Sequence, residues 1–290
     1  MGYRLRTLGL FGAMAALFAA VGWILGGFFA GDWMLGAVVF LGIAVVMNVI
    51  SYFYSKKIVL RAYKAKIVTQ EEAPKLHRMI QDIAMKANMP MPEVAIIPSG
   101  TPNAFATGRN PSDAVVAVTH GLLRVLDESE LEGVLAHEMA HIQNRDILVM
   151  SVAATLAGAI SFAARFAFYG TLFGGRDNAA SIAIVMLAAI TAPIAAMLVQ
   201  MGISRNREYK ADATGAAFIG NPRALANALR KLEMANSRVP MDGGNPSSGH
   251  MFIVNPFRGG MMASLFSTHP PIESRIKKLE LQESRLGYYR

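Results

Sequence analysis

The sequence predicts an α-helical membrane protein whose polar remainder folds as an α+β domain, mostly helical with a small sheet. Of its 290 residues, 53% are hydrophobic and only 17% are charged, whereas a typical soluble domain has about 25% charged residues. Four long apolar stretches hold most of this excess. The two polar segments carry short valine-rich runs and one well-capped helix. A disordered chain is therefore excluded, and an ordinary soluble protein is disfavoured.

Each apolar stretch reaches or exceeds the ~20 residues that cross a bilayer as a helix. The stretches run from Leu8 to Ala30, from Trp33 to Tyr54, from Ile147 to Phe173 and from Asn178 to Ser204. Only a few residues join the first to the second and the third to the fourth. We therefore expect four transmembrane helices, arranged as two helical hairpins.

Two other interpretations of these stretches exist. Arg4 and Arg6 precede the first stretch, as in a signal peptide, but the apolar part of a signal peptide has only ~7–15 residues. We therefore expect an uncleaved anchor. The third and fourth stretches could be a helical pair buried in a soluble core, since Arg165 interrupts the third. An arginine there can extend its guanidinium to the far interface, which favours a membrane hairpin.

Basic residues flank the expected spans on one side. These are Arg4, Arg6, Lys56, Lys57, Arg61, Lys64, Lys66, Arg145, Arg205, Arg207 and Lys210. The two short turns on the other side hold only Asp32, Arg176 and Asp177. The positive-inside rule then places both termini and both polar segments in the cytoplasm. Attraction of these residues to anionic lipid accounts for the net charge of +8. No nucleic-acid partner is expected, because residues 67–146 are not basic and the sequence contains no RNA- or DNA-binding motif.

The chain is therefore expected to have four parts. Residues 1–54 form an N-terminal transmembrane hairpin and residues 147–204 a second one. Residues 55–146 and 205–290 form the two halves of one cytoplasmic domain. No cysteine is present, which excludes disulfides, thiolate metal sites and cysteine nucleophiles.

The first polar segment carries the strand signals. Val94 to Ile97 and Ala114 to Thr119 are short and β-branched, which is typical of buried strands. The turn-rich sequence between them has room for a short edge strand around Ala104 to Thr107. An ordinary hairpin turn is the alternative there.

One helix start is well marked. Asp127 followed three residues later by Glu130 predicts an N-cap with a capping box, and the helix then continues to about Asn144. Residues 236–268 are rich in Gly, Asn, Pro and Ser, and we expect a long mobile loop there.

The predicted helix contains the motif His137-Glu138-Met139-Ala140-His141. Residues four apart share one face of a helix, so both imidazoles can bind one cation, and Glu138 can take a proton from water beside it. Two surface histidines on an amphipathic helix are the alternative. The pattern favours a metal site.

A hydrolytic zinc site needs a third protein ligand. The position where an extended motif places a third histidine is Ile147, so a carboxylate must come from elsewhere. Glu208 lies just after the fourth apolar stretch, as His141 lies just before the third, and a hairpin would bring the two side by side. Asp212, one turn further, can hold a ligand imidazole by its second nitrogen. A solvated helix face is the alternative for both acidic residues.

Together these motifs resemble the HtpX family of bacterial inner-membrane zinc metalloproteases, gluzincin-type enzymes related to the CAAX prenyl endopeptidases. The resemblance rests on HEMAHIQNRD at 137–146, EYKAD at 208–212, PNAFATG at 102–108 and THPPIESRI at 268–276. It covers nearly the whole chain, with no departure at the ligand positions.

The resemblance implies a zincin-like catalytic domain with one Zn²⁺ per chain on His137, His141 and Glu208. It also implies that His269 and Arg275 act near the substrate carbonyl, although Arg275 could equally be a salt-bridge residue. His77, His120 and His250 match no motif and are expected to be ordinary surface or core residues.

The expected activity is membrane-bound peptide hydrolysis with Glu138 as the general base. An extended substrate is expected to pair with the backbone of Asn103, Ala104 and Phe105. The resemblance implies misfolded or damaged membrane proteins as substrates, hence quality control and stress response. The rival classes are an inactive metal-binding scaffold or chaperone, and a metal sensor or transporter. The expected spans offer few metal-binding side chains for a transporter, and an inactive scaffold does not need Glu138.

Overall fold

The computed structural model describes residues 31–146, 204–238 and 269–287, together with Ile253 and scattered positions between 12 and 27. The chain divides into two compact units, residues 1–53 with 148–203 and residues 54–147 with 204–290. The first expected span lies largely, and the third and fourth almost entirely, outside the described residues. The roles assigned to the four parts stay predictions.

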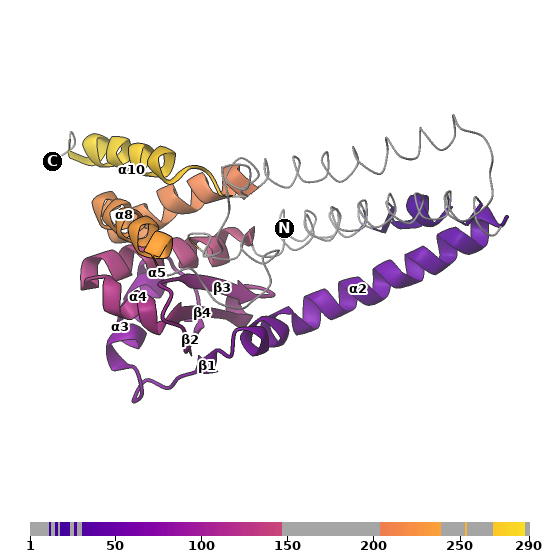
Figure 1. Cartoon of the computed structure of the whole chain (residues 1–290), viewed down its shortest axis with the longest axis horizontal. Helices are drawn as coiled ribbons and strands as arrows, with labels where there is room; N and C mark the ends of the chain where they lie inside the picture. Colours follow the sequence, from indigo (N-terminus) through magenta and orange to yellow (C-terminus); the bar gives the residue numbers. More distant parts are fainter. Residues whose placement is uncertain are drawn as a thin grey trace. The chain divides into compact units, whose positions relative to one another are not determined.

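Helix α2 (Trp33–Ala62) covers the second expected span and continues eight residues beyond it (Figure 1). The carboxylate of Asp32 accepts a hydrogen bond from the backbone N–H of Leu35 at 2.9 Å, which caps the first turn. Within the described residues, no helix meets both the length and the hydrophobicity needed to traverse a bilayer.

The second unit contains a mixed sheet of four strands in the order β1-β2-β4-β3 (Figure 1). The strands are β1 (Lys66–Ile67), β2 (Glu93–Ile97), β3 (Ala104–Gly108) and β4 (Ala114–Thr119). β2 and β4 are parallel, and the other two pairings are antiparallel. The expected mostly helical fold with a small sheet is confirmed. Strand β3 lies at one end of the sheet, as the turn-rich sequence around it suggested.

Alternate residues of the strands face two different cores, because successive side chains of a strand point to opposite faces. Val116 and Val118 of β4 join the larger cluster, which includes residues of α3 and α5. Val115 and Ala117 join a smaller cluster in which Phe105 of β3 packs near the end of α2. The β4 run is therefore apolar without alternation, as a strand covered on both faces should be.

Helices cover the larger core in layers: α5 packs against β3 and β4, α8 packs against α5, and α10 packs against α8 (Figure 1). Their bounds are α3 (Pro74–Lys86), α4 (His120–Val125), α5 (Glu128–Asn144), α8 (Pro222–Arg238) and α10 (Ile272–Gly287), and residues 204–219 are also helical. α8 corrects the expected loop at 236–268, because the helix extends to Arg238. An amphipathic helix ends where its apolar face no longer packs against a neighbour, and the composition of residues 236–268 does not mark that position. Apart from Ile253, residues 239–268 lie outside the description.

Helix α5 begins at the capping box that the sequence indicated. The Asp127 side chain accepts from the N–H of Glu130 at 3.0 Å, and the Glu130 side chain accepts from the N–H of Asp127 at 3.0 Å. Gly133 lets α8 approach closely, since a Cβ at this position would lie 2.7 Å from the backbone nitrogen of Leu225. α5 is thus held between the sheet and α8 along most of its length.

Candidate metal centre

Three side chains converge from two separate helical segments. His137 and His141 lie one turn apart on α5, and Glu208 comes from helical residues 204–219. Potential ligand atoms of all three lie within 4.8 Å of one another. His141 Nε2 is 3.3 Å from Glu208 Oε1, and the Nε2 atoms of the two histidines are 3.2 Å apart. The structure therefore brings together the three residues that the sequence suggested as ligands.

A glycine explains how the two helical segments come so close. A Cβ on Gly215 would lie 2.8 Å from the backbone of Ala136 and 2.8 Å from the nitrogen of His137, closer than real Cβ contacts. The missing side chain lets helix 204–219 rest on α5 beside the first imidazole. Glu208 and Asp212, two turns and one turn before Gly215, then reach the histidines.

Asp212 and Arg275 support His137, and Arg275 also contacts Glu208, with 3.2 Å between Nη1 and Oε2. His137 Nδ1 lies 2.9 Å from Asp212 Oδ1. Arg275, from α10, donates to Asp212 through Nη2 at 2.6 Å and through Nε at 2.8 Å. This two-pronged contact is the strongest geometry for a guanidinium and a carboxylate. Arg275 is fully buried, so the structure places it as an ion-pair residue that positions Asp212.

Asp146 supports His141 in the same way, and the sequence reasoning missed it. His141 Nδ1 lies 3.0 Å from Asp146 Oδ2, and the other carboxylate oxygen accepts from Arg207. Arg145 has a left-handed backbone with φ 58°, which turns the chain back at the end of α5 and returns Asp146 to the helix. A carboxylate five residues after the second histidine was the available signal.

This arrangement fits a bound cation. Because each Nδ1 faces a carboxylate, each imidazole in its neutral, metal-binding form keeps its proton on Nδ1 and presents a lone pair on Nε2. Two such lone pairs and the carboxylate of Glu208 then face one another inside the protein. Acceptors repel at these distances unless a proton or a metal ion lies among them. Two imidazoles and one carboxylate are a donor set that divalent transition metals favour.

The pKa values of the ligands reflect the same crowding. Burial lowers the pKa of His137, which favours the neutral imidazole that a metal needs. Burial alone would also lower the pKa of His141, but its contacts with Asp146 and Glu208 raise this pKa to about 10. Burial would raise the pKa of Glu208, and the neighbouring His269 and Arg275 instead hold it well below its usual range.

Glu138 lies beside this group on α5 and is buried. Burial raises its pKa to about 7, against the effect of a hydrogen bond with the backbone of Ala106 in β3. A carboxyl group that titrates near neutrality can both accept and return a proton near neutral pH. Glu138 is thus placed between the metal ligands and the edge strand.

His269 also lies at the centre, as the THPPIESRI motif implied. Its Nδ1 is 3.2 Å from Glu208 Oε2, and the residue is buried just before α10. His77 and His120, which matched no motif, lie elsewhere: His77 contacts the Ala73 carbonyl within α3, and His120 is exposed at the start of α4. His250 is outside the described residues.

The edge strand offers its backbone to a partner, whereas its side chains are buried. Phe105 faces away from α5 and contacts the ring of Tyr63 at a centroid distance of 5.5 Å. The side chain of Asn103 bonds to the N–H of Ala104. The Ala104 carbonyl accepts from the N–H of Ile253 at 3.3 Å, and the Ile253 carbonyl accepts from Arg275 at 3.0 Å. The N–H and C=O of Asn103 both bond to Thr119, and Phe105 pairs with Ala117 of β4, so Ala104 is the residue of this group whose backbone faces away from the sheet.

Comparisons with known proteins agree with this chemistry. The model of peptidase family M48 matches residues 70–283. A protease HtpX homologue of Syntrophobacter fumaroxidans is 51% identical over 285 residues, covering 96% of this chain and 99% of its own. A homologue of Pyrococcus furiosus is 49% identical, covering 99% of this chain and 98% of its own.

The crystal structure of S. mikatae Ste24p has the same fold, with a TM-score of 0.58 at 21% identity. The match covers 93% of this chain and 62% of that one. The family thus agrees with a site in which two histidines and a glutamate face one another. The chain belongs to peptidase family M48 and is a metalloprotease.

Proposed function

We propose that the protein is a zinc-dependent endopeptidase, anchored in a membrane, that cleaves polypeptides on the cytoplasmic side. One Zn²⁺ per chain is held by His137, His141 and Glu208. The observation that carries this proposal is the convergence of two imidazole lone pairs and a carboxylate next to the buried Glu138. Two imidazoles and a carboxylate beside a buried glutamate are typical of sites for metal-assisted hydrolysis.

The chain's own residues supply proton transfer and positioning. When bound, the metal polarises a peptide carbonyl and makes water acidic enough to ionise near neutral pH. Glu138 takes the proton from the attacking water and returns it to the leaving amine. His269, beside Glu208, donates toward the carbonyl oxygen as negative charge develops on it. Asp212 and Asp146 hold the imidazoles in the tautomer that leaves Nε2 free.

Main-chain recognition suits substrates without a fixed sequence. An extended polypeptide adds to the edge formed by Asn103, Ala104 and Phe105, through the outward-facing backbone of Ala104, and such strand addition reads chain conformation more than side chains. The contact between Ala104 and Ile253 supports this assignment, since it shows a backbone amide bound at this edge. Misfolded or damaged membrane proteins, degraded for quality control under stress, are the proposed substrates.

The membrane assignment is supported by side-chain exposure along α2. Large apolar residues from Trp33 to Ile58 are exposed, among them Leu35, Val46 and Phe53. Soluble proteins rarely expose a continuous apolar surface of this extent. We propose four spans in a bacterial inner membrane, with both termini and the catalytic unit in the cytoplasm.

The proposal is tested with the full-length protein in liposomes and a single-span model substrate that carries an unfolded cytoplasmic tail. We expect cleavage that stops on chelation and returns with Zn²⁺. Glu138→Gln should keep one metal per chain by elemental mass spectrometry and lose at least about 10³-fold in cleavage rate. Glu132→Gln removes a more exposed carboxylate of the same helix and should cleave normally.

Normal turnover by Glu138→Gln, or cleavage that chelation leaves unchanged, would contradict the mechanism. Metal binding without cleavage by the unaltered protein would instead identify a metal-binding scaffold.

A further inference from the structure

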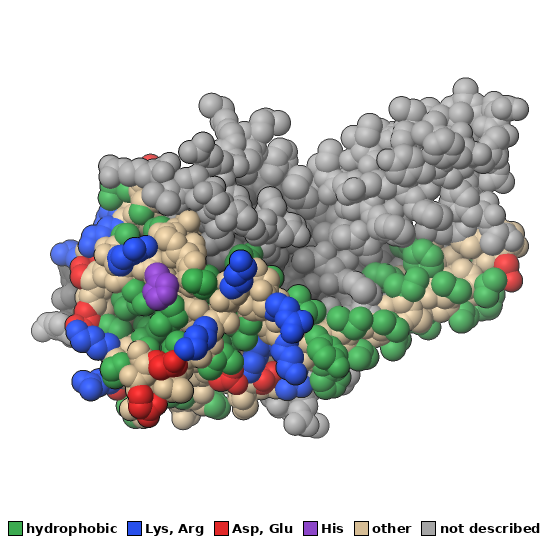
Figure 2. Space-filling model, turned by 60° about the horizontal axis from the view of Figure 1, so that its bottom comes forward, with side chains coloured by type: hydrophobic (Ala, Val, Ile, Leu, Met, Phe, Trp, Pro, Cys, Tyr) green, Lys and Arg blue, Asp and Glu red, His purple; other side chains and the backbone are tan. Residues whose placement is uncertain are grey.

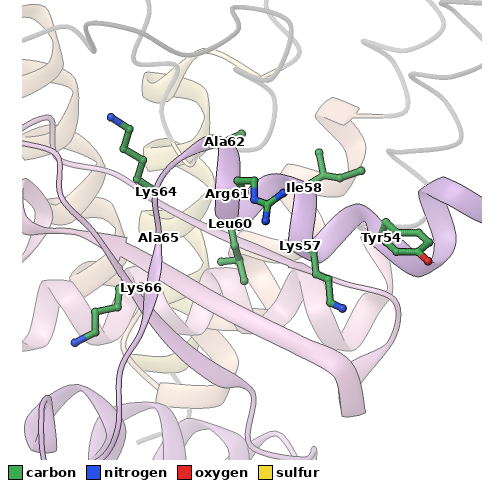
Figure 3. A pocket seen from close by; sticks show the side chains of 9 residues that line it. All are labelled: Tyr54, Lys57, Ile58, Leu60, Arg61, Ala62, Lys64, Ala65 and Lys66. Atoms are coloured by element: carbon green, nitrogen blue, oxygen red, sulfur yellow. The ribbon is translucent and has the colours of Figure 1, made fainter.

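A basic hollow lies at the end of α2, where the chain leaves the helix and enters β1. Its volume is about 1010 Å³. The residues that line it, shown in Figure 3, are Tyr54, Lys57, Ile58, Leu60, Arg61, Ala62, Lys64, Ala65 and Lys66. None of them belongs to the metal centre. We refer to this feature as the basic hollow.

Three of its four cations have no acidic neighbour among the described residues: Lys57, Arg61 and Lys64. Lys66 pairs with Glu72 at 2.6 Å. Lys56, next in the chain but not part of the lining, pairs with both Glu93 and Asp113. The charge of Lys56, just outside the basic hollow, is therefore neutralised, whereas most of the cations that line the hollow are available to another partner. Figure 2 shows Lys and Arg side chains gathered where α2 ends.

Apolar side chains share the helix face that carries the cations. Tyr54, Lys57, Ile58 and Arg61 are spaced i, i+3, i+4 and i+7, so they lie along one side of α2. Tyr54 and Ile58 are more than half exposed. A tyrosine beside cations at the end of an apolar helix is typical of the boundary between lipid tails and headgroups. The face offers an anion-binding end and an apolar end.

The turn after α2 brings two more cations to the same hollow. The N–H of Lys64 bonds to the Arg61 carbonyl, and that of Ala65 to the Leu60 carbonyl, the pattern of a Schellman helix end. The left-handed position of this motif normally holds glycine, but here it is Lys64 with φ 52°. A long cationic side chain has no intrinsic reason to be in this conformation. Lys64 and Lys66 of this turn also line the hollow, and Figure 3 shows their side chains extending away from those of Lys57 and Arg61.

We propose that the basic hollow binds the headgroup of one anionic phospholipid. Arg61 pairs its planar guanidinium with the phosphate oxygens, and the flexible lysine side chains of the lining add positive charge around it. The first acyl carbons lie against Ile58 and Tyr54. An apolar wall beside the cations favours an amphiphile over free phosphate or nucleic acid. This site rests on the proposed membrane attachment and is independent of the peptidase chemistry.

The test is native mass spectrometry of the full-length protein in detergent with added phosphatidylglycerol or phosphatidylcholine. The test variant is Arg61→Gln with Lys64→Gly, which removes two cations and places the residue that the left-handed position prefers. The matched control is Lys75→Gln with Arg78→Gln, two exposed cations of α3 outside the basic hollow. We expect one preferentially retained phosphatidylglycerol in the unaltered protein and in the control. The test variant should bind it about 30-fold more weakly, because each cation contributes roughly fivefold near an anionic lipid.

Equal retention of the two lipids, or unchanged phosphatidylglycerol affinity in the test variant, would overturn the proposal. Displacement of the lipid by millimolar inorganic phosphate, or tighter binding of an oligonucleotide, would assign the basic hollow to a soluble anion instead. This experiment does not measure peptidase activity. A protein that binds phosphatidylglycerol but cleaves no substrate would therefore contradict the proposed hydrolysis and still support the lipid site.

Discussion

The two imidazoles of the metal centre are held by the same device in different surroundings. His137, Asp212 and Arg275 are all buried, and the guanidinium grips the carboxylate at two points. On the other side, the His141 side chain is 15% exposed and that of Arg207 is 28% exposed. The first arrangement joins three distant segments of the chain. The second is assembled around the end of α5 and the residue just before Glu208.

Because of this difference, the loss of one partner should have different effects on the two sides of the site. The His137 side is a structural connection, in which loss of one partner leaves buried charge uncompensated. The His141 side lies nearer to solvent, because the side chains of His141 and Arg207 are partly exposed, although Asp146 is buried. The following predictions, in order of decreasing effect, test whether the two sides behave so differently.

Removing the guanidinium should have very unequal effects on the two sides. Arg275→Met leaves Asp212 and Glu208 buried without their cation, so the free energy of unfolding should fall by about 3–5 kcal/mol. Arg207→Met should lower it by only about 1 kcal/mol, because Arg207 is partly exposed and its buried partner Asp146 keeps its contact with His141. Chemical denaturation of the metal-free protein in detergent measures both. Equal losses would show that the two sides do not differ.

Gly215→Ala tests how closely the two ligand-bearing segments must approach. The added Cβ would push against the backbone of Ala136 and His137, with a cost of about 1–3 kcal/mol. It should also weaken metal binding, because Glu208 and Asp212 move with the displaced helix. Gly133→Ala crowds Leu225 to a similar degree, but α8 carries no ligand. That variant should lose stability and keep its metal affinity, as chelator competition can measure.

The carboxylates behind the imidazoles should tune metal affinity. Asp212→Asn and Asp146→Asn each remove the charge that fixes an Nδ1 proton, and such changes typically weaken metal binding 10–100-fold. We expect the larger loss for Asp212, whose histidine is fully buried, measured by competition with a chelator of known affinity. A larger loss for Asp146 would reverse the ranking of the two sides.

Metal uptake should release a proton from His141. In the metal-free protein the pKa of His141 is raised to about 10, so its imidazole is protonated at pH 8 and must deprotonate to bind metal. Apparent metal affinity should then rise about tenfold per pH unit while that proton is being displaced. Calorimetric titrations in buffers of different ionisation enthalpy count the protons. Release of none near pH 8 would mean that the imidazole is already neutral.

Local signals in the sequence predicted the parts of this site that depend on local chemistry. Asp127 and Glu130 marked the start of α5, the spacing of His137 and His141 placed both on one face, and β-branched runs marked β2 and β4. These features act within a few residues, so a sequence reveals them.

The missed parts depend on packing between distant segments. α3 and α8 carry no motif, and the two-residue β1 is strand only because it pairs with β2. Arg275 could have been an ordinary surface ion pair, and only the position of α10 makes it a buried partner of Asp212. Asp146 was visible as a carboxylate near the motif, but its role requires the left-handed turn at Arg145.

Metal content is the most direct measure of whether Glu208 and the two histidines share one ion. Elemental mass spectrometry of the purified full-length protein should find one Zn²⁺ per chain, and likewise in the control variants His120→Ala and Glu132→Gln, which change residues outside the metal centre. Glu208→Ala and His141→Ala should each retain less than about a tenth of that after dialysis against a mild chelator. A full equivalent of tightly bound metal in Glu208→Ala would contradict the account.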